Sequence, residues 1–443
     1  MRPLVAAIRA ILAVTLRIFF KKIELRGVER VPTAGPVIFV LNHPNGLIDP
    51  VFLLCLAPRR VCFVAKAPLF KIPVVGALVR AFDSLPVQRR QDEASGVDNT
   101  ETFKRARALL LGGGSLAIFP EGASHSDPRL RPLKTGVARI ALGTGLADLK
   151  IVPAGLYYTD KAIFRSEAVV YFGEPLAVAA ATPGEDGAPP EAAVRALTSA
   201  IERALSEVLL QADEAAALAL ISRAERAYSA AQAEQAAPAL VDRFERRRRF
   251  IAGYHHLLEH EPEALSELVR RLDAYEAELT RLGLTPEHPS AAALRGGAII
   301  RVGLSSFFIL AALAPLAMVG TLVHYPAYRA IGALARRVAR DEDDLLSTIK
   351  VLGALLLFPL TWALCAAAVG LRVGGPSAAL ALLLAPLSGW AALRFWERVD
   401  WLGAGARVAW IWLWRRSLLA RLSAARAAIH AEIAAIERRY GAA

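Results

Sequence analysis

Cysteine is scarce in this 443-residue chain, and that scarcity excludes two classes of protein. The three cysteines, Cys55, Cys62 and Cys365, form no even set and no CxxC pair. A disulfide scaffold needs paired cysteines, and a thiolate metal site needs closely spaced ones. We therefore interpret all three as small buried hydrophobic residues. His255, His256 and His260 have no carboxylate or cysteine cluster in ligand register, so we predict surface positions for them and no metal site.

Motifs for binding nucleotides and nucleic acids are also missing. The stretch LLLGGGSLAIF lacks the GK[ST] ending of a phosphate-binding P-loop, and its position indicates a helix end followed by a turn. Lysine plus arginine exceeds aspartate plus glutamate by 53 − 41 = 12, an excess that suits nucleic acid, anionic lipid or a phosphorylated substrate. Because the basic residues crowd near apolar segments and in RFERRRRF, we favour a membrane surface and predict no nucleic-acid partner.

Long apolar runs, by contrast, are abundant. Hydrophobic residues make up 55% of the chain. The mean hydropathy of +0.38 is above the usual value for a soluble protein. Val302 to Val323 and Val351 to Leu371 are long enough to cross a bilayer and contain no charge, while Ser377 to Leu393 is borderline. The alternative is buried core helices of a large soluble protein. All seven tryptophans lie in the last fifth of the chain, mixed with arginine as in an interfacial belt.

The number of membrane spans stays open at this stage. Three spans after a cytoplasmic domain would place the basic loop Arg329 to Arg340 on the far side, against the positive-inside rule. A first segment that is interrupted by Pro315 and is re-entrant or lies shallow would instead leave a two-helix hairpin with both flanks cytosolic. Either arrangement predicts an integral membrane protein whose N-terminal domain faces the cytoplasm. The sequence makes no prediction of oligomeric state.

The N-terminus predicts an interfacial amphipathic helix over residues 1–22. Arg9 and Arg17 break every candidate span there, but they can lie at the headgroups while Leu, Ile and Phe enter the acyl region. An ordinary docking helix is the alternative.

The remaining organisation divides the chain into four parts. Residues 23–183 alternate β-rich runs (PVIFVL, VCFVAK, SLAIFP, IVPAGLYY, AVVYFG) with helical stretches at Asp92 to Leu111 and Lys134 to Leu146, which predicts an α/β domain with a mixed sheet. After a Pro- and Gly-rich linker at Thr182 to Pro190, we predict a helical extension, a membrane region with two or three apolar helices, and a basic, Trp-rich interfacial tail. Their boundaries are 184–297, 298–397 and 398–443.

The stretch LNHPNGLIDP, residues 41–50, follows an apolar strand and carries the first candidate chemistry. Asp49 and Pro50 resemble an N-cap followed by the first helical residue, so a capping aspartate beside a loop histidine is one interpretation. A six-residue offset cannot place His43 and Asp49 on one face of a helix. If the loop folds back, however, the carboxylate can hold one ring nitrogen and leave the other as a general base.

Three further blocks follow in order: LPVQRR (85–90), FPEGASHSDPRLRPLKTG (119–136) and IVPAG (151–155). Together with HPNGLID they resemble the four motifs of the glycerolipid acyltransferase family. The chain departs from the commoner pattern in two respects. Five residues instead of four separate His43 from Asp49, and Ala123 and Ser124 replace the usual threonine and arginine. With APLSGWAALRFWERVD near the C-terminus, these departures resemble the fungal glycerol-3-phosphate/dihydroxyacetone-phosphate acyltransferases and their bacterial relatives.

The resemblance implies a role for each matching residue. It implies His43 as base, Asp49 as its orienter, Arg89 as a phosphate contact, and Glu121 with Gly122 in the acceptor site. Two further substrate-binding candidates are Asn42, directly before the histidine, and Lys134, which could add a point charge for phosphate. The ligand that replaces the missing arginine is open: Arg129 and Arg131 are candidates, and each is equally consistent with a solvated loop charge.

The implied activity is membrane-bound transfer of a fatty acyl group from acyl-CoA or acyl carrier protein, with no cofactor. The acceptor would be the hydroxyl of glycerol-3-phosphate, dihydroxyacetone phosphate or 1-acylglycerol-3-phosphate. Glycerol-3-phosphate and 1-acylglycerol-3-phosphate (lysophosphatidic acid) differ by one acyl chain, and the motifs do not distinguish these two acceptors. The alternative is a non-catalytic lipid-binding membrane protein that keeps the fold. A transporter is disfavoured because charged residues lining the spans are missing.

Overall fold

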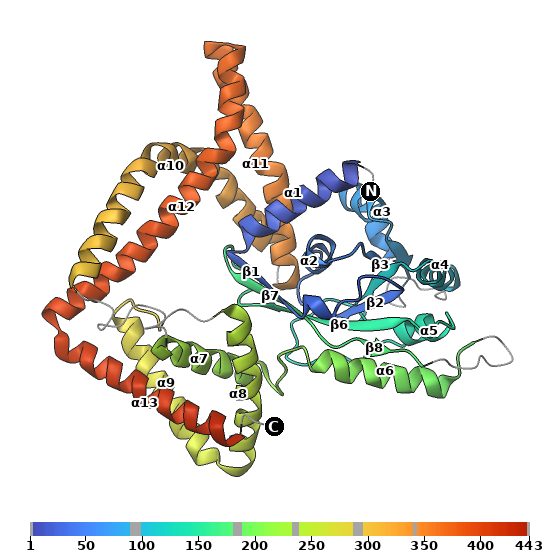
Figure 1. Cartoon of the computed structure of the whole chain (residues 1–443). Helices are drawn as coiled ribbons and strands as arrows, with labels where there is room; N and C mark the ends of the chain where they lie inside the picture. Colours follow the sequence, from blue (N-terminus) through green and yellow to red (C-terminus); the bar gives the residue numbers. More distant parts are fainter. Residues whose placement is uncertain are drawn as a thin grey trace. The chain divides into compact units, whose positions relative to one another are not determined.

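The structure is a computed structural model that describes residues 3–88, 99–179, 188–232, 239–286, 296–339 and 343–440. It divides into two compact units. The first, here called the α/β unit, comprises Met1–Asp213 and Ala339–Thr348. The second, here called the helical unit, comprises Glu214–Val338 and Ile349–Ala443. Figure 1 labels the elements of both units.

The α/β unit is built on one mixed sheet in the order β1-β7-β6-β2-β5-β3-β4, with β8 pairing against β6. The central strand β2 pairs in parallel with both β5 and β6, whereas β7 and β8 run antiparallel to β6. All five side chains of β2 are buried, as expected for an apolar, β-branched strand covered on both faces. The strand bounds are β1 Lys22–Arg26, β2 Val37–Leu41, β3 Cys62–Lys66, β4 Leu85–Val87, β5 Ser115–Ile118, β6 Lys150–Tyr158, β7 Glu167–Phe172 and β8 Leu176–Ala177.

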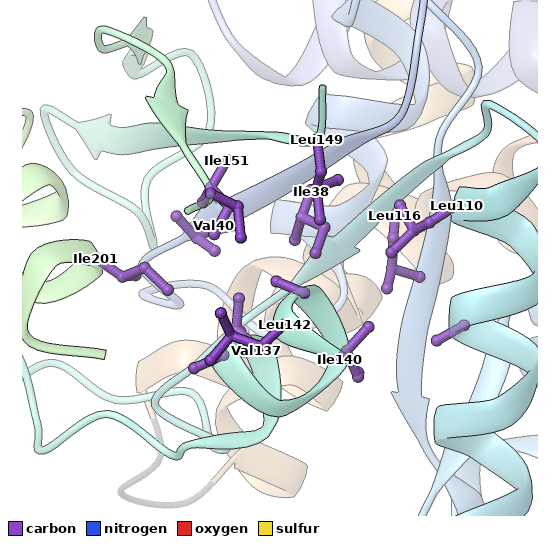
Figure 2. Close-up of a cluster of buried hydrophobic side chains, with 14 of the residues drawn as sticks. Ile38, Val40, Leu110, Leu116, Val137, Ile140, Leu142, Leu149, Ile151 and Ile201 are labelled. Atoms are coloured by element: carbon purple, nitrogen blue, oxygen red, sulfur yellow. The ribbon is translucent and has the colours of Figure 1, made fainter. Parts of the chain in front are cut away.

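Helices cover both faces of this sheet. On one face, Ile38 and Val40 of β2 pack with residues of α4 (Thr100–Leu111), α5 (Gly136–Leu142) and α6 (Glu191–Ser206), as Figure 2 shows. Alternation along a strand sends Phe39 to the opposite face. There the ring of Tyr158, in β6, contacts Phe52 of α2 (Ile48–Leu56) and Phe20, which directly follows α1 (Pro3–Phe19). The unit is completed by η1 (Val28–Arg30), η2 (Ala67–Lys71) and α3 (Pro73–Ala81).

The predicted α/β domain with a mixed sheet is confirmed. All five β-rich runs form strands, and the two helical stretches become α4 and α5, although α4 is described only from Thr100. Residues 180–187, which hold most of the predicted linker, lie outside the described residues. The sequence-based boundary at residue 183 differs from the structural division, because α6 buries Val194 and Ile201 against the sheet.

The N-terminal helix α1 shows both features that the sequence left open. One side, with Val5, Leu12, Leu16 and Phe19, is buried, and α1 packs against α2. The other side exposes an apolar stripe formed by Leu4, Ile11, Val14 and Ile18. The helix therefore docks on the α/β unit and still presents apolar surface outward; its place at a membrane interface stays a prediction.

The helical unit has a core of its own formed by α7 (Ala215–Gln232), α8 (Leu240–His260), α9 (Pro262–Arg281) and α13 (Arg416–Tyr440). Within it, the buried Glu225 carboxylate accepts hydrogen bonds from Arg243 and Arg247 at 3.2 and 3.0 Å. These two arginines belong to RFERRRRF. That basic run is therefore partly internal, because a buried carboxylate requires cationic partners, and the membrane surface favoured for the basic residues stays a prediction.

Three helices of this unit are long and apolar enough to cross a membrane: α10 (Gly296–Ala339), α11 (Asp343–Val373) and α12 (Gly375–Trp414). Side-chain hydrogen bonds join them in pairs. Trp362 of α11 donates to His324 of α10 at 2.8 Å, and Trp396 of α12 donates to Thr321 of α10 at 2.9 Å. Helix α10 continues through Pro315 without a break, so a re-entrant turn at that proline is not what the structure shows. The three candidate spans confirm the predicted C-terminal apolar helices.

Candidate active site

The candidate site lies where three neighbouring parallel strands end. β2, β5 and β6 end at Leu41, Ile118 and Tyr158, with β2 between the other two. Crevices outside the carboxyl ends of such strands are the usual place for ligands in α/β sheets. The segment of residues 42–49, which comprises the loop after β2 and the first two residues of α2, is here called the His43 loop.

The His43 loop folds back and brings its histidine and aspartate together. The Nδ1 atom of His43 lies 2.8 Å from Oδ2 of Asp49, and the N–H of Asn45 donates to the same oxygen at 2.7 Å. The hydroxyl of Tyr158 donates to the other oxygen, Oδ1, at 2.6 Å. The interpretation of Asp49 as an N-cap was wrong. Helix α2 begins at Ile48, and its N-cap is Leu47.

The electrostatics of this arrangement follow from burial. Asp49 is fully buried, and a carboxylate in that position requires hydrogen-bond donors. Burial, followed by the adjacent carboxylate, raises the pKa of Tyr158 well above its usual value, so that its hydroxyl remains a donor. With Nδ1–H given to Asp49, the lone pair of His43 is left on Nε2, which has no hydrogen-bond partner among the described residues.

An aromatic ring fixes the plane of the imidazole. The rings of His43 and Phe119 stack with centroids 4.0 Å apart and an angle of 15° between their planes. Phe119 follows β5 directly, so two adjacent strand ends supply the two stacked rings. The face of an aromatic ring attracts a cation, so this stacking also favours the imidazolium that forms when His43 takes a proton.

Glu121 ties the loop after β5 to the His43 loop. Its Oε1 accepts the backbone N–H of His43 at 3.2 Å, and its Oε2 accepts the backbone N–H of Arg131 at 3.0 Å and pairs with His125 Nε2. The N–H of His125 donates in turn to the carbonyl of His43 at 3.0 Å. Glu121 is thus a buried connector in the described structure, and its predicted contact with the acceptor stays a prediction.

The other predicted site residues lie around this centre. Both polar atoms of the Asn42 side chain bond the backbone of Leu156, at 3.0 and 2.7 Å, so Asn42 joins β2 to β6. Gly122 has φ +79°, a left-handed conformation that favours glycine, and a Cβ atom there would meet the Lys134 side chain at 3.6 Å. Lys134 is exposed and donates its backbone N–H to Pro120. Arg89 lies outside the described residues. The substrate-binding roles of all four stay predictions.

Two arginines were candidates to replace the family arginine that is missing after Gly122. Both pair with carboxylates. Arg129 pairs with Asp213, and Arg131 donates to Asp127 at 2.6 Å. The hydrogen bond from Arg131 lowers the pKa of the Asp127 carboxyl. In the described part of the chain, no group of three or more His, Cys, Asp or Glu side chains is placed to hold a metal ion.

Several residues of the site escaped prediction from sequence. Tyr158 and Phe119 stood inside quoted motifs without an assigned role, and His125 belonged to the SH pair after the Glu-Gly motif. Asn45, inside the His43 loop, is fully buried, and neither polar atom of its side chain has a partner among the described residues. Strand alternation could have placed Tyr158 on the face of Phe39, whereas the other contacts depend on how the loops fold.

Residues 22–157 match the family model described as Acyltransferase. An acyltransferase of Schizosaccharomyces pombe, described as uncharacterized, is 26% identical over 80% of this chain and 66% of its own length. Glycerol-3-phosphate O-acyltransferase 2 of Saccharomyces cerevisiae is 30% identical, over 61% of this chain and 38% of its own. A chloroplastic 1-acyl-sn-glycerol-3-phosphate acyltransferase of Arabidopsis thaliana is 35% identical, over 32% of this chain and 38% of its own.

Among solved structures, the chain is similar to the 1-acyl-sn-glycerophosphate (LPA) acyltransferase PlsC from Thermotoga maritima. The TM-score is 0.35 at 20% identity, over 47% of this chain and 83% of that one.

Residues 22–157, which hold His43 and Asp49 at the end of the central strand, thus match a family model of acyltransferases. The relatives of the chain include glycerol-3-phosphate and 1-acylglycerol-3-phosphate acyltransferases, as the motifs predicted. The chain spans between 38 and 66% of the length of the three curated relatives named above.

Proposed function

We propose that this protein is a membrane-bound O-acyltransferase that moves a fatty acyl group from acyl-CoA or acyl carrier protein to a phosphorylated glycerol acceptor. The observation that carries the proposal is the contact between His43 Nδ1 and buried Asp49. It leaves Nε2 of a neutral imidazole as a proton acceptor at the carboxyl end of β2, which is where a base for acyl transfer is needed.

The proposed reaction proceeds by direct attack. His43 Nε2 takes the proton from the acceptor hydroxyl while the hydroxyl oxygen forms a bond to the thioester carbonyl carbon. The resulting tetrahedral intermediate expels the thiolate as its carbon–sulfur bond breaks, and the imidazolium returns the proton to that sulfur. Asp49 stabilises the positive charge on the ring through Nδ1–H. No serine or cysteine nucleophile is required.

Neither cysteine of the α/β unit suits covalent catalysis. Burial raises the pKa of the Cys55 thiol to about 11, and burial together with Asp83 raises that of Cys62 to about 11. The thiolate is the reactive form, so both groups are inert near neutral pH. This supports the direct attack proposed above.

The acceptor is proposed as glycerol-3-phosphate, dihydroxyacetone phosphate or 1-acylglycerol-3-phosphate. The names of the relatives support the first and the third. The phosphate would be bound by basic side chains near the site, with Arg89 and Lys134 as candidates. The proposal includes a cytoplasmic α/β unit. It is supported by the basic residues that follow the last apolar segment, because α13 shares one core with α7, α8 and α9 and so lies on the same side of a membrane as the helices that precede the apolar segments.

A substrate panel tests the proposal. Purified full-length protein in vesicles is given radiolabelled acyl-CoA or acyl carrier protein with each of the three acceptors, and the products are separated by chromatography. We expect transfer to at least one phosphorylated acceptor and none to glycerol. Absence of transfer from both donors to every acceptor would contradict the proposal and leave a non-catalytic lipid-binding protein.

Removing the Tyr158 hydroxyl should weaken catalysis without removing the base. Tyr158→Phe deletes one of three donors to Asp49, and a hydrogen bond to a charged group contributes about 1.5–3 kcal/mol. We expect kcat to fall about tenfold while KM for the acceptor stays unchanged, because the hydroxyl acts through Asp49 and not on the substrate. Steady-state kinetics check this. The matched control Tyr157→Phe, on the other face of β6, should keep full activity; equal losses in both variants would refute the assignment.

A further inference from the structure

The beginning of helix α11 is hydrogen-bonded to the His43 loop. The backbone N–H of Leu47 donates to Oγ1 of Thr348 at 3.2 Å, and the hydroxyl of Ser347 donates to the carbonyl of Lys161. Ser347 and Thr348 are both buried, and residues 339–348 belong to the same compact unit as the sheet. The first residues of α11, as far as Thr348, are therefore part of the α/β unit.

Lys161 extends these contacts to two further loops. Its ammonium donates to the carbonyl of Pro44, next to His43, at 2.9 Å, and also to the hydroxyl of Ser126. The loop that follows β6 thus links three segments: the His43 loop, the loop after Glu121 and the start of α11. Since Leu47 and Pro44 lie on either side of Asn45, the contacts restrain the central part of the His43 loop.

The same helix is a candidate membrane span from Leu345 to Val373, so Ser347 and Thr348 lie at one end of the stretch that can cross a bilayer. Two other features of the α/β unit suit a bilayer near this loop. Ile163, on the loop after β6, is 57% exposed. The guanidinium of Arg165 on that loop donates to the backbone of Ile18, at the end of the exposed apolar stripe of α1.

We propose that Ser347 and Thr348 are positioning residues that fasten the His43 loop to the membrane end of α11, so that His43 works at the depth of the lipid headgroups. A long-chain acyl substrate would then reach the base from the bilayer and not from bulk water. This inference rests on the proposed acyl-transfer function, and it assigns to the start of α11 a task beyond anchoring.

The test compares two acyl donors in one set of vesicles. Full-length protein is reconstituted in phosphatidylcholine/phosphatidylglycerol vesicles, and kcat/KM is measured for palmitoyl-CoA, which partitions into the bilayer, and for octanoyl-CoA, which stays largely in water. Thr348→Val keeps the shape of the side chain but removes the acceptor for Leu47 N–H. We expect the ratio of the two values, palmitoyl over octanoyl, to fall about five- to tenfold, and to recover in Thr348→Ser.

Thr361→Val is the matched control, because Thr361 lies on the same helix and its hydroxyl donates to Leu357 of that helix. Its donor ratio should be unchanged. An equal loss with both donors in Thr348→Val would show a merely structural role and overturn the inference. If the wild-type protein transferred neither acyl group, the proposed function would fail first, so the two failures are distinguishable.

A second measurement does not depend on activity. A spin label at Ile163→Cys, in a variant with Cys365→Ala, reports depth through its relative accessibility to oxygen and to a water-soluble nickel complex. Cys55 and Cys62 resist labelling because burial raises the pKa of each to about 11. We expect the label to lie at headgroup depth. A label as accessible to the nickel complex as one on a soluble protein would overturn the inference.

Discussion

His43→Ala should reduce acyl transfer by about 10²–10⁴-fold, the usual contribution of a positioned base. The ring of His43 contacts Asp49 through Nδ1, and its Nε2 is left to accept a proton from the substrate. No other imidazole in the described part of the chain contacts that carboxylate. His125, the other histidine of the site, pairs with Glu121. The measurement is the initial rate of radiolabelled acyl transfer under saturating donor and acceptor.

The fold should survive this substitution. His43 contributes two main-chain hydrogen bonds to the site, its N–H to Glu121 and its carbonyl to His125, and alanine keeps both. The side chain is 17% exposed, so its loss leaves a partly buried void and removes one of the three donors to Asp49. Circular dichroism should therefore match the wild-type protein, while the melting temperature should fall by a few degrees. His256→Ala, a change in the helical unit, should keep wild-type activity. Near wild-type transfer by folded His43→Ala would refute the assignment of the base.

The strands β2, β3, β5, β6 and β7 were predictable because their signal is local, whereas β1 was not predicted. Runs such as PVIFVL and AVVYFG are apolar and β-branched, and each forms a strand within a residue or two of the predicted bounds. β4 and β8, with three and two residues, carry too little pattern to be recognised alone. Helix α6 was assigned to the helical extension because an amphipathic helix does not reveal in its sequence which surface covers its apolar face.

The site was predictable in its components and not in its connections. The motif HPNGLID identified His43 and Asp49, but whether they meet depends on the fold of a loop, which spacing alone does not decide. Tyr158 reaches Asp49 across 109 positions, and Thr348 reaches Leu47 across 301. Contacts of that kind come from strand order and from the path of α11, neither of which a sequence motif records. The N-cap prediction for Asp49 needed only neighbouring residues, so the sequence alone could suggest it, whereas the long-range contacts could not be read from a motif.

The N-terminal helix combines the docked face of one interpretation with an exposed apolar stripe, and its place at a membrane interface stays a prediction. Residues 1–22 were expected to be either interfacial or docked. In the structure, Leu12 and Leu16 are buried while Leu4 and Ile11 are exposed, so opposite faces of α1 are apolar. A helix that is apolar on both sides needs a second partner for its outer face. In a chain with three candidate spans, the lipid surface is the partner that we propose for it.

Asp49→Asn should lower kcat nearly as much as loss of the base, by about 10²–10⁴-fold, although it changes the shape of the site little. The wild-type carboxylate accepts from His43 and Asn45 at Oδ2 and from Tyr158 at Oδ1. An asparagine can place its carbonyl oxygen at the Oδ2 position and its amide nitrogen opposite Tyr158, whose hydroxyl can rotate to accept. What disappears is the negative charge that stabilises the imidazolium, which is needed only while His43 holds the proton.

The Asp49→Asn variant therefore separates charge from geometry. Because the substrate is bound by other groups, KM for the acceptor should stay near the wild-type value while kcat falls. The double variant His43→Ala/Asp49→Asn should be no slower than His43→Ala alone, since the carboxylate acts only through the ring. Kinetics of the four proteins, with melting temperatures measured in parallel, decide the matter. Additive losses in the double variant would mean that Asp49 acts independently of His43, and the proposed pair would have to be abandoned.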